Sequence, residues 1–294
     1  MMGAAQDQLN PSVASREVTV IRPPAGWVPV DIADLWRYRE LLWLFTLRDI
    51  KARYKQTAMG PLWVLLPPLM STGIFSLILG VLADLPSGGL PYPLFIFAAV
   101  LAFNLFSTAF NKTSNCLVAN EAIFTKVYFP RLIIPIASAI SGIVDFVVGM
   151  ALLILLMALY RMAPGLALVT APMFLLLAIV FGMAGGLWLA AFGVRVRDFR
   201  LAGSFLAPFL MWISPVMYSS ELVFKENRLP EIWQEVYRLN PLYWVVDGFR
   251  WSLYGWENGR PNLDFLWAWV IALALLMSGL FYFRRTESSF ADVV

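Results

Sequence analysis

The sequence contains no histidine and only one cysteine, Cys116. The absence of histidine excludes Ser-His-Asp and Cys-His catalysis, metal sites with histidine ligands and pH switches based on histidine. A single cysteine excludes an intramolecular disulfide and a metal site built from several cysteines. We therefore expect no metal and no cofactor in this chain.

Charged residues are also scarce. Asp, Glu, Lys and Arg make up 14% of the chain, whereas about a quarter is usual in soluble domains. Apolar residues make up 60% of the chain, and its mean hydropathy is +0.71. A larger soluble core cannot absorb this excess, so the composition predicts an integral membrane protein.

Six apolar stretches are long enough to cross a bilayer, which takes about 20 residues in a helix. One of them, 132–160, contains a single charged residue, Asp145, and the other five contain no Asp, Glu, Lys or Arg: 61–82, 90–110, 162–194, 201–220 and 265–283. The sequence therefore predicts an all-α membrane protein with six transmembrane helices within 61–283. The first residues contain no continuous apolar run, so we expect no cleaved leader.

Lys and Arg are distributed unevenly between the two sides of the predicted bundle. Eight of the 22 precede the first apolar stretch. With the N-terminus inside, the second and fourth connections and the C-terminal tail are also inside and add eight more. The outer stretch 221–264 has five basic and seven acidic residues. The positive-inside rule therefore predicts that both tails, 1–33 and 284–294, are cytoplasmic.

Residues 34–57 are too charged to cross a membrane, but their apolar residues follow a helical spacing. We expect a helix with Asp34 as its N-cap. It would carry an apolar stripe of Trp36, Trp43, Leu47, Ile50 and Tyr54 beside a basic stripe of Arg37, Arg48, Lys51 and Lys55. This pattern predicts a helix at the inner membrane interface. It indicates equally an anchor on anionic lipid and a docking place for a phosphate-bearing substrate.

The second inner connection, 111–131, is too long for a tight turn, and its next-to-last residue is Pro130. Proline at this place favours a short helix that stops there. The connection mixes charged and aromatic side chains, among them Glu121, Phe124 and Lys126. This mixture indicates a protein-binding surface, and the alternative is a turn that simply packs on the bundle.

The outer stretch contains two further predicted helices. Residues 229–239 place Ile232, Val236 and Leu239 on one face. The run that follows Asn240 gives at most about 21 Å of helix, which is too short to span, so we interpret it as a re-entrant or interfacial helix. Its aromatic residues are typical of a membrane-interface belt, and a gate over a pore is the alternative: Tyr243, Trp244, Phe249, Trp251 and Tyr254.

Asp145 is the one acid within the apolar stretches. A carboxyl group in the bilayer must face protein or water and is a functional candidate by default. The alternative is a hydrogen-bonded or protonated structural acid, which we favour slightly.

Prolines and glycines predict local features of the spans. Pro67, Pro68, Pro208 and Pro215 should kink or shorten their helices. Gly182, Gly185 and Gly186 form a patch for close helix contact, either within one chain or between subunits.

Four segments resemble, in family order, the permease subunits of polysaccharide ABC exporters. They are TLRDIKARYKQTAMGPLWVLLPPLM at 46–70, NEAIFTKVYFPRLIIP at 120–135, VRVRDFR at 194–200 and LNPLYWVVDGFRW at 239–251. These permeases have the type-2 ABC exporter fold, which serves O-antigen, teichoic acid and capsule export. The resemblance covers about residues 35–285 and does not specify the glycan.

The resemblance implies a bacterial inner-membrane protein that pairs with a second copy of itself and with two separate ABC ATPase subunits. It implies a lipid-linked polysaccharide, on a polyprenyl diphosphate, as the substrate. By position, 34–57 is then the interface helix, 118–130 the coupling helix that faces the ATPase, and 221–254 the outer gate helices. Coupling would rest on Glu121, Phe124 and Lys126, the gate on Tyr243, Trp244, Phe249 and Trp251, and headgroup binding on Arg48, Lys51, Arg53 and Lys55.

The sequence is consistent with ATP binding on a separate subunit. The sequence contains no Gly-Lys pair and therefore no phosphate-binding loop for ATP. Moving charge through hydrocarbon is uphill, by about 2.5–3.5 kcal/mol for one helix-borne charge. ATP and Mg would then be bound by the partner subunit, and we expect this chain to be no enzyme and to bind membrane lipid but no nucleic acid.

Three other functions would leave different signs in the sequence. An ion-coupled transporter would show several intramembrane ionisable groups and an internal repeat, whereas this sequence has only Asp145 and no repeat. A membrane glycosyltransferase would need acid–base or metal-binding groups, and there is no Asp-x-Asp motif. An ABC exporter of a drug or small lipid is the strongest alternative.

Overall fold

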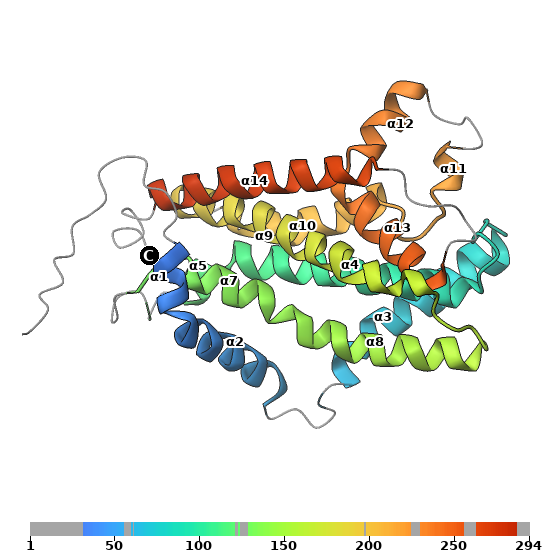
Figure 1. Cartoon of the computed structure of the whole chain (residues 1–294), viewed down its shortest axis with the longest axis horizontal. Coiled ribbons are helices and arrows are strands. Elements are labelled where there is room, and N and C mark those ends of the chain that lie inside the picture. The colour runs from blue at the N-terminus through green and yellow to red at the C-terminus, as the bar shows by residue number, and fades with distance from the viewer. Residues whose placement is uncertain are drawn as a thin grey trace, which may run out of the picture.

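A computed structural model gives the fold of the chain, and the residues it describes are 32–55, 60, 62–120, 123, 129–196, 198–224, 230–255 and 263–286. These residues form helices and their connections, with no strand among them. The helices run roughly along one long axis (Figure 1). The predicted all-α membrane class is confirmed.

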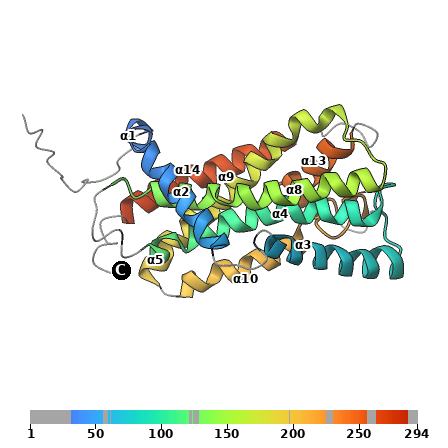
Figure 2. The same cartoon turned by 90° about the horizontal axis from the view of Figure 1, so that it is seen from below.

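Helix α4 (Tyr92–Ser114) lies at the centre of the bundle, and most of its residues are buried. It packs against α9 (Ala171–Arg195), and α9 packs in turn against α14 (Phe265–Thr286). Helices α7 (Ile133–Ile140) and α8 (Gly142–Leu159) cover another side of α4. The core of the molecule is thus one central helix with the others placed around it (Figures 1 and 2).

Within the described residues, five helical segments are long and apolar enough to span a membrane: Leu62–Leu82, Tyr92–Ser114, Ile133–Leu159, Leu166–Arg195 and Phe265–Thr286. The predicted stretch 201–220 forms a shorter helix, α10 (Asp198–Ile213), of 16 residues. That is about 24 Å of helix, and it ends where Ser214 and Pro215 form a turn. The count of six spans therefore stays a prediction, because α10 is shorter than the usual spanning length.

The proline prediction is met only where Pro215 follows the end of α10, since Pro208 lies inside that helix. Helix α3 (Leu62–Phe75) also contains Pro67 and Pro68 and continues as a π-helix, η2 (Ser76–Leu82). The α9 glycines contact α4 of the same chain, and a Cβ at Gly182 would lie 2.7 Å from the carbonyl oxygen of Phe106. The small-residue patch therefore serves contact within the subunit.

The segment 34–57 forms two helices, α1 (Ile32–Arg37) and α2 (Arg39–Tyr54), instead of one. The prediction of Asp34 as N-cap is wrong, because α1 begins at Ile32 and Asp34 lies in its first turn. The chain turns at Tyr38, which packs on a buried cluster at this end of the bundle. From there α2 packs on α7 and runs obliquely towards α8 (Figure 2).

The outer stretch forms α11 (Glu221–Phe224), α12 (Glu231–Arg238) and α13 (Pro241–Tyr254). The apolar face predicted for α12 is present but exposed, with Ile232 71% exposed. Helices α11 and α12 lie at the end of the molecule opposite α2 and the C-terminal end of α14 (Figure 1). We call these the outer end and the inner end, after the predicted orientation.

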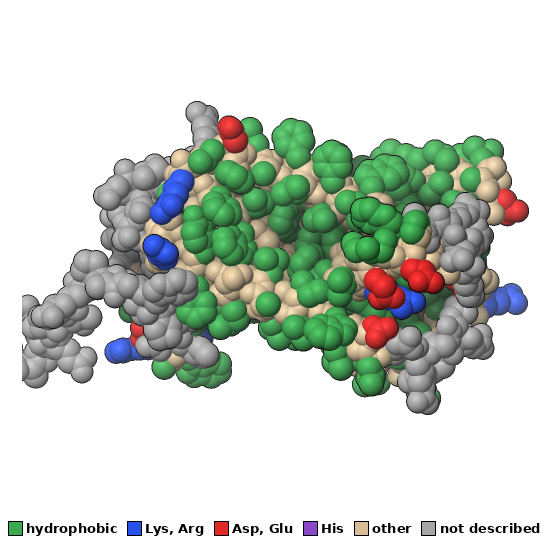
Figure 3. All heavy atoms as spheres, turned by 90° about the horizontal axis from the view of Figure 1, so that it is seen from above, with side chains coloured by type: hydrophobic (Ala, Val, Ile, Leu, Met, Phe, Trp, Pro, Cys, Tyr) green, Lys and Arg blue, Asp and Glu red, His purple; other side chains and the backbone are tan. Residues whose placement is uncertain are grey.

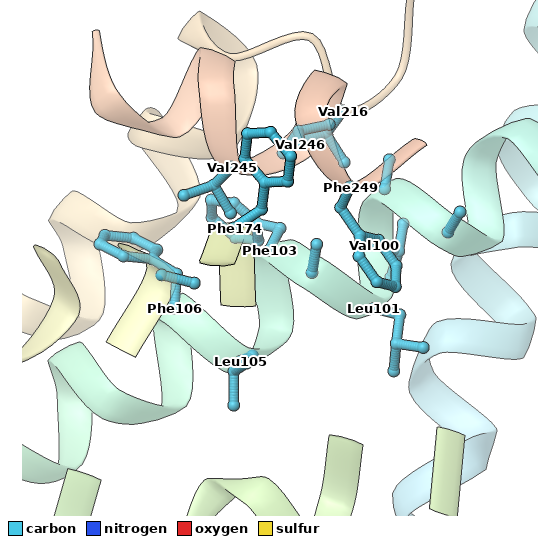
Figure 4. Close-up of a cluster of buried hydrophobic side chains, with 14 of the residues drawn as sticks. Val100, Leu101, Phe103, Leu105, Phe106, Phe174, Val216, Val245, Val246 and Phe249 are labelled. Carbon is cyan, nitrogen blue, oxygen red and sulfur yellow. The ribbon is translucent and has the colours of Figure 1, made fainter. Parts of the chain in front are cut away.

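Helix α13 packs between α4, α9 and α14, and its side chains complete the main core. Figure 4 shows Val245, Val246 and Phe249 of α13 against Phe103 of α4 and Phe174 of α9. Gly248 permits this approach, because a Cβ there would overlap the Phe174 ring. The surface on the α14 side is apolar over its middle, and charged side chains lie mainly towards its two ends (Figure 3). This is the distribution expected of a membrane protein.

Candidate functional site

A polar pocket of about 770 Å³ lies at the inner end, between α2, the C-terminal end of α4, the short helix α5 (Cys116–Ala119) and α7. Three cationic side chains and one acid line it: Arg48, Arg53, Lys112 and Asp49. Its other polar lining residues are Asn111, Asn115, Asn120 and Ser138. The volume is in the range of small-molecule sites, so this is the candidate functional site.

Arg48 is held at one wall of the pocket by two neighbours. Its Nη2 donates to the side-chain oxygen of Asn120 at 2.6 Å and to Asp49 Oδ1 at 2.8 Å. The guanidinium also lies 4.9 Å from the centre of the Phe45 ring. Arg48 is 39% exposed, so the side chain is fixed in place while it still faces the opening. A guanidinium has five N–H donors, and these contacts leave donors for a ligand.

Arg53, at the other end of the pocket, forms an ion pair with Asp145 of α8. The hydroxyl of Tyr54 donates to the second carboxyl oxygen of Asp145 at 2.6 Å. Burial and the neighbouring carboxylate raise the pKa of Tyr54 to about 12. The hydroxyl therefore stays protonated and remains a donor at physiological pH. Asp145 thus ties the last turn of α2 to the first turn of α8.

Lys112 comes from the last turn of α4 and faces the same pocket. Its Nζ donates to the hydroxyl of Ser141 at 2.6 Å. Among the described residues, no carboxylate forms an ion pair with Lys112. The structure thus places a third cation beside Arg48 and Arg53, and within the described part of the chain its ammonium donates to the neutral hydroxyl of Ser141.

The predicted headgroup residues are only partly brought together. Arg48 and Arg53 line the pocket. Lys51 on α2 and Lys55, which directly follows α2, are exposed and do not line it. Lys112 is the third cation that lines the pocket. Sequence reasoning counted Lys112 only as an inner charge, because it stands 57 positions after Lys55 and follows no shared periodicity with α2.

The predicted coupling residues Glu121, Phe124 and Lys126 lie outside the described residues. Next to them the structure describes the end of α5 and, at Phe129, a buried ring whose centre lies 5.5 Å from that of the Phe45 ring of α2, at an angle of 54°. The coupling role of 118–130 stays a prediction.

The aromatic residues of α13 do not form a membrane-interface belt. Tyr243, Trp244 and Phe249 are buried, and Trp251 and Tyr254 are half-buried. The belt interpretation is wrong because α13 lies among α4, α9 and α14 instead of at the lipid surface. The gate interpretation stays a prediction. These residues pack α13 into the outer half of the core, where Tyr243 and Trp244 contact at 4.7 Å.

Sequence reasoning missed Arg250 of α13, which is 4% exposed. Its guanidinium donates to three backbone carbonyl groups, those of Phe95 at 3.0 Å, Pro215 at 2.6 Å and Val216 at 2.7 Å. It also lies 3.5 Å from the centre of the Phe95 ring. Arg250 therefore joins α13 to the start of α4 and to the turn after α10. A lone arginine in an apolar run was the available signal.

The chain is similar to known membrane transport proteins. Residues 40–254 match the profile of the family described as ABC-2 type transporter. The chain is 25% identical over 266 residues to the O-antigen export system permease protein RfbA of Myxococcus xanthus, covering 90% of this chain and 98% of that protein. It is 22% identical over 259 residues to RfbA of Klebsiella pneumoniae, covering 87% and 95%. It is 24% identical over 249 residues to the polysialic acid transport protein KpsM of Escherichia coli, covering 83% and 92%.

Proposed function

This chain belongs to the ABC-2 type transporter family, and we propose that it is the permease that carries a lipid-linked polysaccharide, on polyprenyl diphosphate, across the bacterial inner membrane. The resemblance found in the four sequence segments is confirmed by the family match. The similarity to the two O-antigen permeases extends over nearly their whole length, and this observation carries the proposal. A polysaccharide of the O-antigen type is the proposed cargo.

The energy for export is supplied by ATP bound, with Mg, to two separate ABC ATPase subunits. A diphosphate carries about two negative charges, so its passage through hydrocarbon costs at least about 5–7 kcal/mol on an insertion scale. The sequence contains no Gly-Lys pair for a phosphate-binding loop. The ATPases bind at the inner end through the segment 118–130, and both tails are cytoplasmic.

A second copy of the chain completes the translocation path. Helices α3 and α10 both pack on α4 and leave large apolar side chains uncovered, among them Leu66 on α3 and Phe205, Phe209 and Trp212 on α10. Figure 2 shows these two helices along one side of the bundle. A homodimer that meets at this side would enclose the path between the two copies. The α2 cations at the inner end receive the diphosphate of the substrate.

The proposal is tested by deleting the gene in its own host and measuring surface polysaccharide and lipid-linked glycan inside the cell. We expect surface glycan to disappear, lipid-linked glycan to accumulate, and both changes to be reversed by the intact gene. An affinity-tagged chain should also retain an ATPase subunit in mild detergent. Unchanged surface glycan, together with lost tolerance to a drug, would favour the export of a small molecule instead.

A further inference from the structure

The pocket at the inner end contains more positive than negative charge. Three cations line it, Arg48, Arg53 and Lys112, against one lining acid, Asp49. Asp145 stands just behind the lining and holds Arg53. Besides Asp49 and Asp145, no acidic side chain among the described residues lines the pocket or pairs with these cations. With Asp145 counted, these five groups carry a net charge of one positive unit. Two guanidinium groups and one ammonium group supply the charge-assisted hydrogen-bond donors that a diphosphate requires.

We propose that this pocket is the diphosphate site of the permease and that the bound anion takes the Arg53 guanidinium from Asp145, which leaves the Tyr54 hydroxyl as the α2 group that still contacts this carboxylate. The inference rests on the proposed function and adds to it the third ligand, Lys112, and a consequence of binding. The four α2 cations named from the sequence are thereby reduced to two.

Arg53 can exchange its partner because its side chain is 41% exposed, whereas Asp145 is 12% exposed. Phosphate oxygens accept the two parallel N–H groups of a guanidinium as well as a carboxylate does. An incoming diphosphate approaches from the open side, where the Arg53 side chain is accessible.

Asp145 keeps a hydrogen-bond donor after the exchange. The Tyr54 hydroxyl continues to donate to it, and a hydrogen bond to a carboxylate strengthens when the competing cation leaves. Lys112 lines the same pocket, and its Nζ donates to Ser141, which stands four positions before Asp145 in the chain. Lys112 is therefore placed to share its charge between the bound diphosphate and the acid.

The exchange predicts that substitutions of Asp145 and of Tyr54 change the affinity for a diphosphate in opposite directions. Asp145→Asn removes the competitor for Arg53, so farnesyl diphosphate, used as a short-chain probe, should bind about two- to fivefold more tightly, as expected for losing a partly exposed ion pair. Tyr54→Phe removes the group that stabilises the released carboxylate, so binding should weaken by a similar factor. Binding is measured by calorimetry on the permease assembled with its ATPase in nanodiscs.

Two lysine variants distinguish binding at this site from a general attraction to anionic lipid. Lys112→Gln should weaken binding of farnesyl diphosphate, whereas Lys51→Gln, an exposed position on α2 outside the pocket, should not. Phosphatidylglycerol in place of the probe should bind the Lys112→Gln variant and the unsubstituted protein equally.

The proposal is overturned if Asp145→Asn, in a monodisperse complex, binds the probe equally or more weakly, or if Lys51→Gln and Lys112→Gln lose the same affinity. If these binding tests fail but the gene deletion still abolishes surface glycan, the diphosphate site is refuted and the proposed function is retained. Conversely, diphosphate binding with the predicted signs but unchanged surface glycan would refute the proposed cargo and retain the site.

Discussion

Replacement of Arg250 by methionine tests whether one buried side chain holds the outer half of the bundle together. Methionine keeps an unbranched apolar stem but leaves the carbonyl oxygens of Phe95, Pro215 and Val216 without their donor. Each buried carbonyl without a partner costs about 1–3 kcal/mol. Effects within one network are not additive, and removal of the buried charge offsets part of the loss.

We therefore expect Arg250→Met to lower the free energy of unfolding by about 3 kcal/mol, which corresponds to a fall in Tm of about 6–12 °C for a chain of this size. Arg250→Lys should lose less, because an ammonium can serve some of the carbonyls but cannot reach all three as the planar guanidinium does. The measurement is thermal unfolding of the purified protein in detergent, followed by tryptophan fluorescence.

Arg238→Met is the matched control. Arg238 lies on α12, where its side chain is 40% exposed and pairs with Glu235 at 3.1 Å. Exposed pairs contribute at most about 1 kcal/mol, so the Tm should fall by no more than about 4 °C. If Arg250→Met unfolded within 2 °C of the unsubstituted protein, the three carbonyl bonds would contribute nothing to stability and the reasoning would be refuted.

Further predictions concern packing, coupling and headgroup binding. Gly182→Ala should lower the Tm, since its Cβ would press on α4, whereas Gly73→Ala, which meets nothing within 4 Å, should not; equal effects would contradict the packing argument. Lys126→Glu should leave the permease inserted but uncouple ATP hydrolysis from export, and normal export would remove 118–130 as the coupling helix. Arg48→Lys should impair substrate-stimulated ATPase activity more than Lys51→Arg does, whereas equal, mild losses would favour a simple lipid anchor.

The class of the protein and the approximate places of its spans could be predicted from the sequence. Length of an apolar run and absence of charge are local properties, and the bilayer imposes them on each helix separately. The five long segments begin and end close to the predicted bounds. The stretch 201–220 differed because Ser214 and Pro215 end α10 early, and length alone does not show where a helix stops.

Helix termini and helix environment were predicted less well. Asp34 has the residue type of an N-cap, but α1 begins two residues earlier. The aromatic residues of α13 fit an interfacial helix by composition, yet α13 lies inside the bundle because Gly248 lets Phe174 approach it. Whether an aromatic side chain meets lipid or protein depends on neighbouring helices, which the local pattern does not contain.

By itself, the sequence determined the membrane class, the uneven distribution of basic residues and the family, since composition and contiguous segments carry these properties. Only the tertiary structure decided which polar side chains meet partners that are distant in the sequence. Arg48 reaches Asn120 across 72 positions, Tyr54 reaches Asp145 across 91, and Arg250 reaches Phe95 across 155. Such pairs follow no periodicity, because they arise where packed helices cross. The pocket at the inner end, with Lys112 as its third cation, therefore appears only once α2, α4 and α7 are in place.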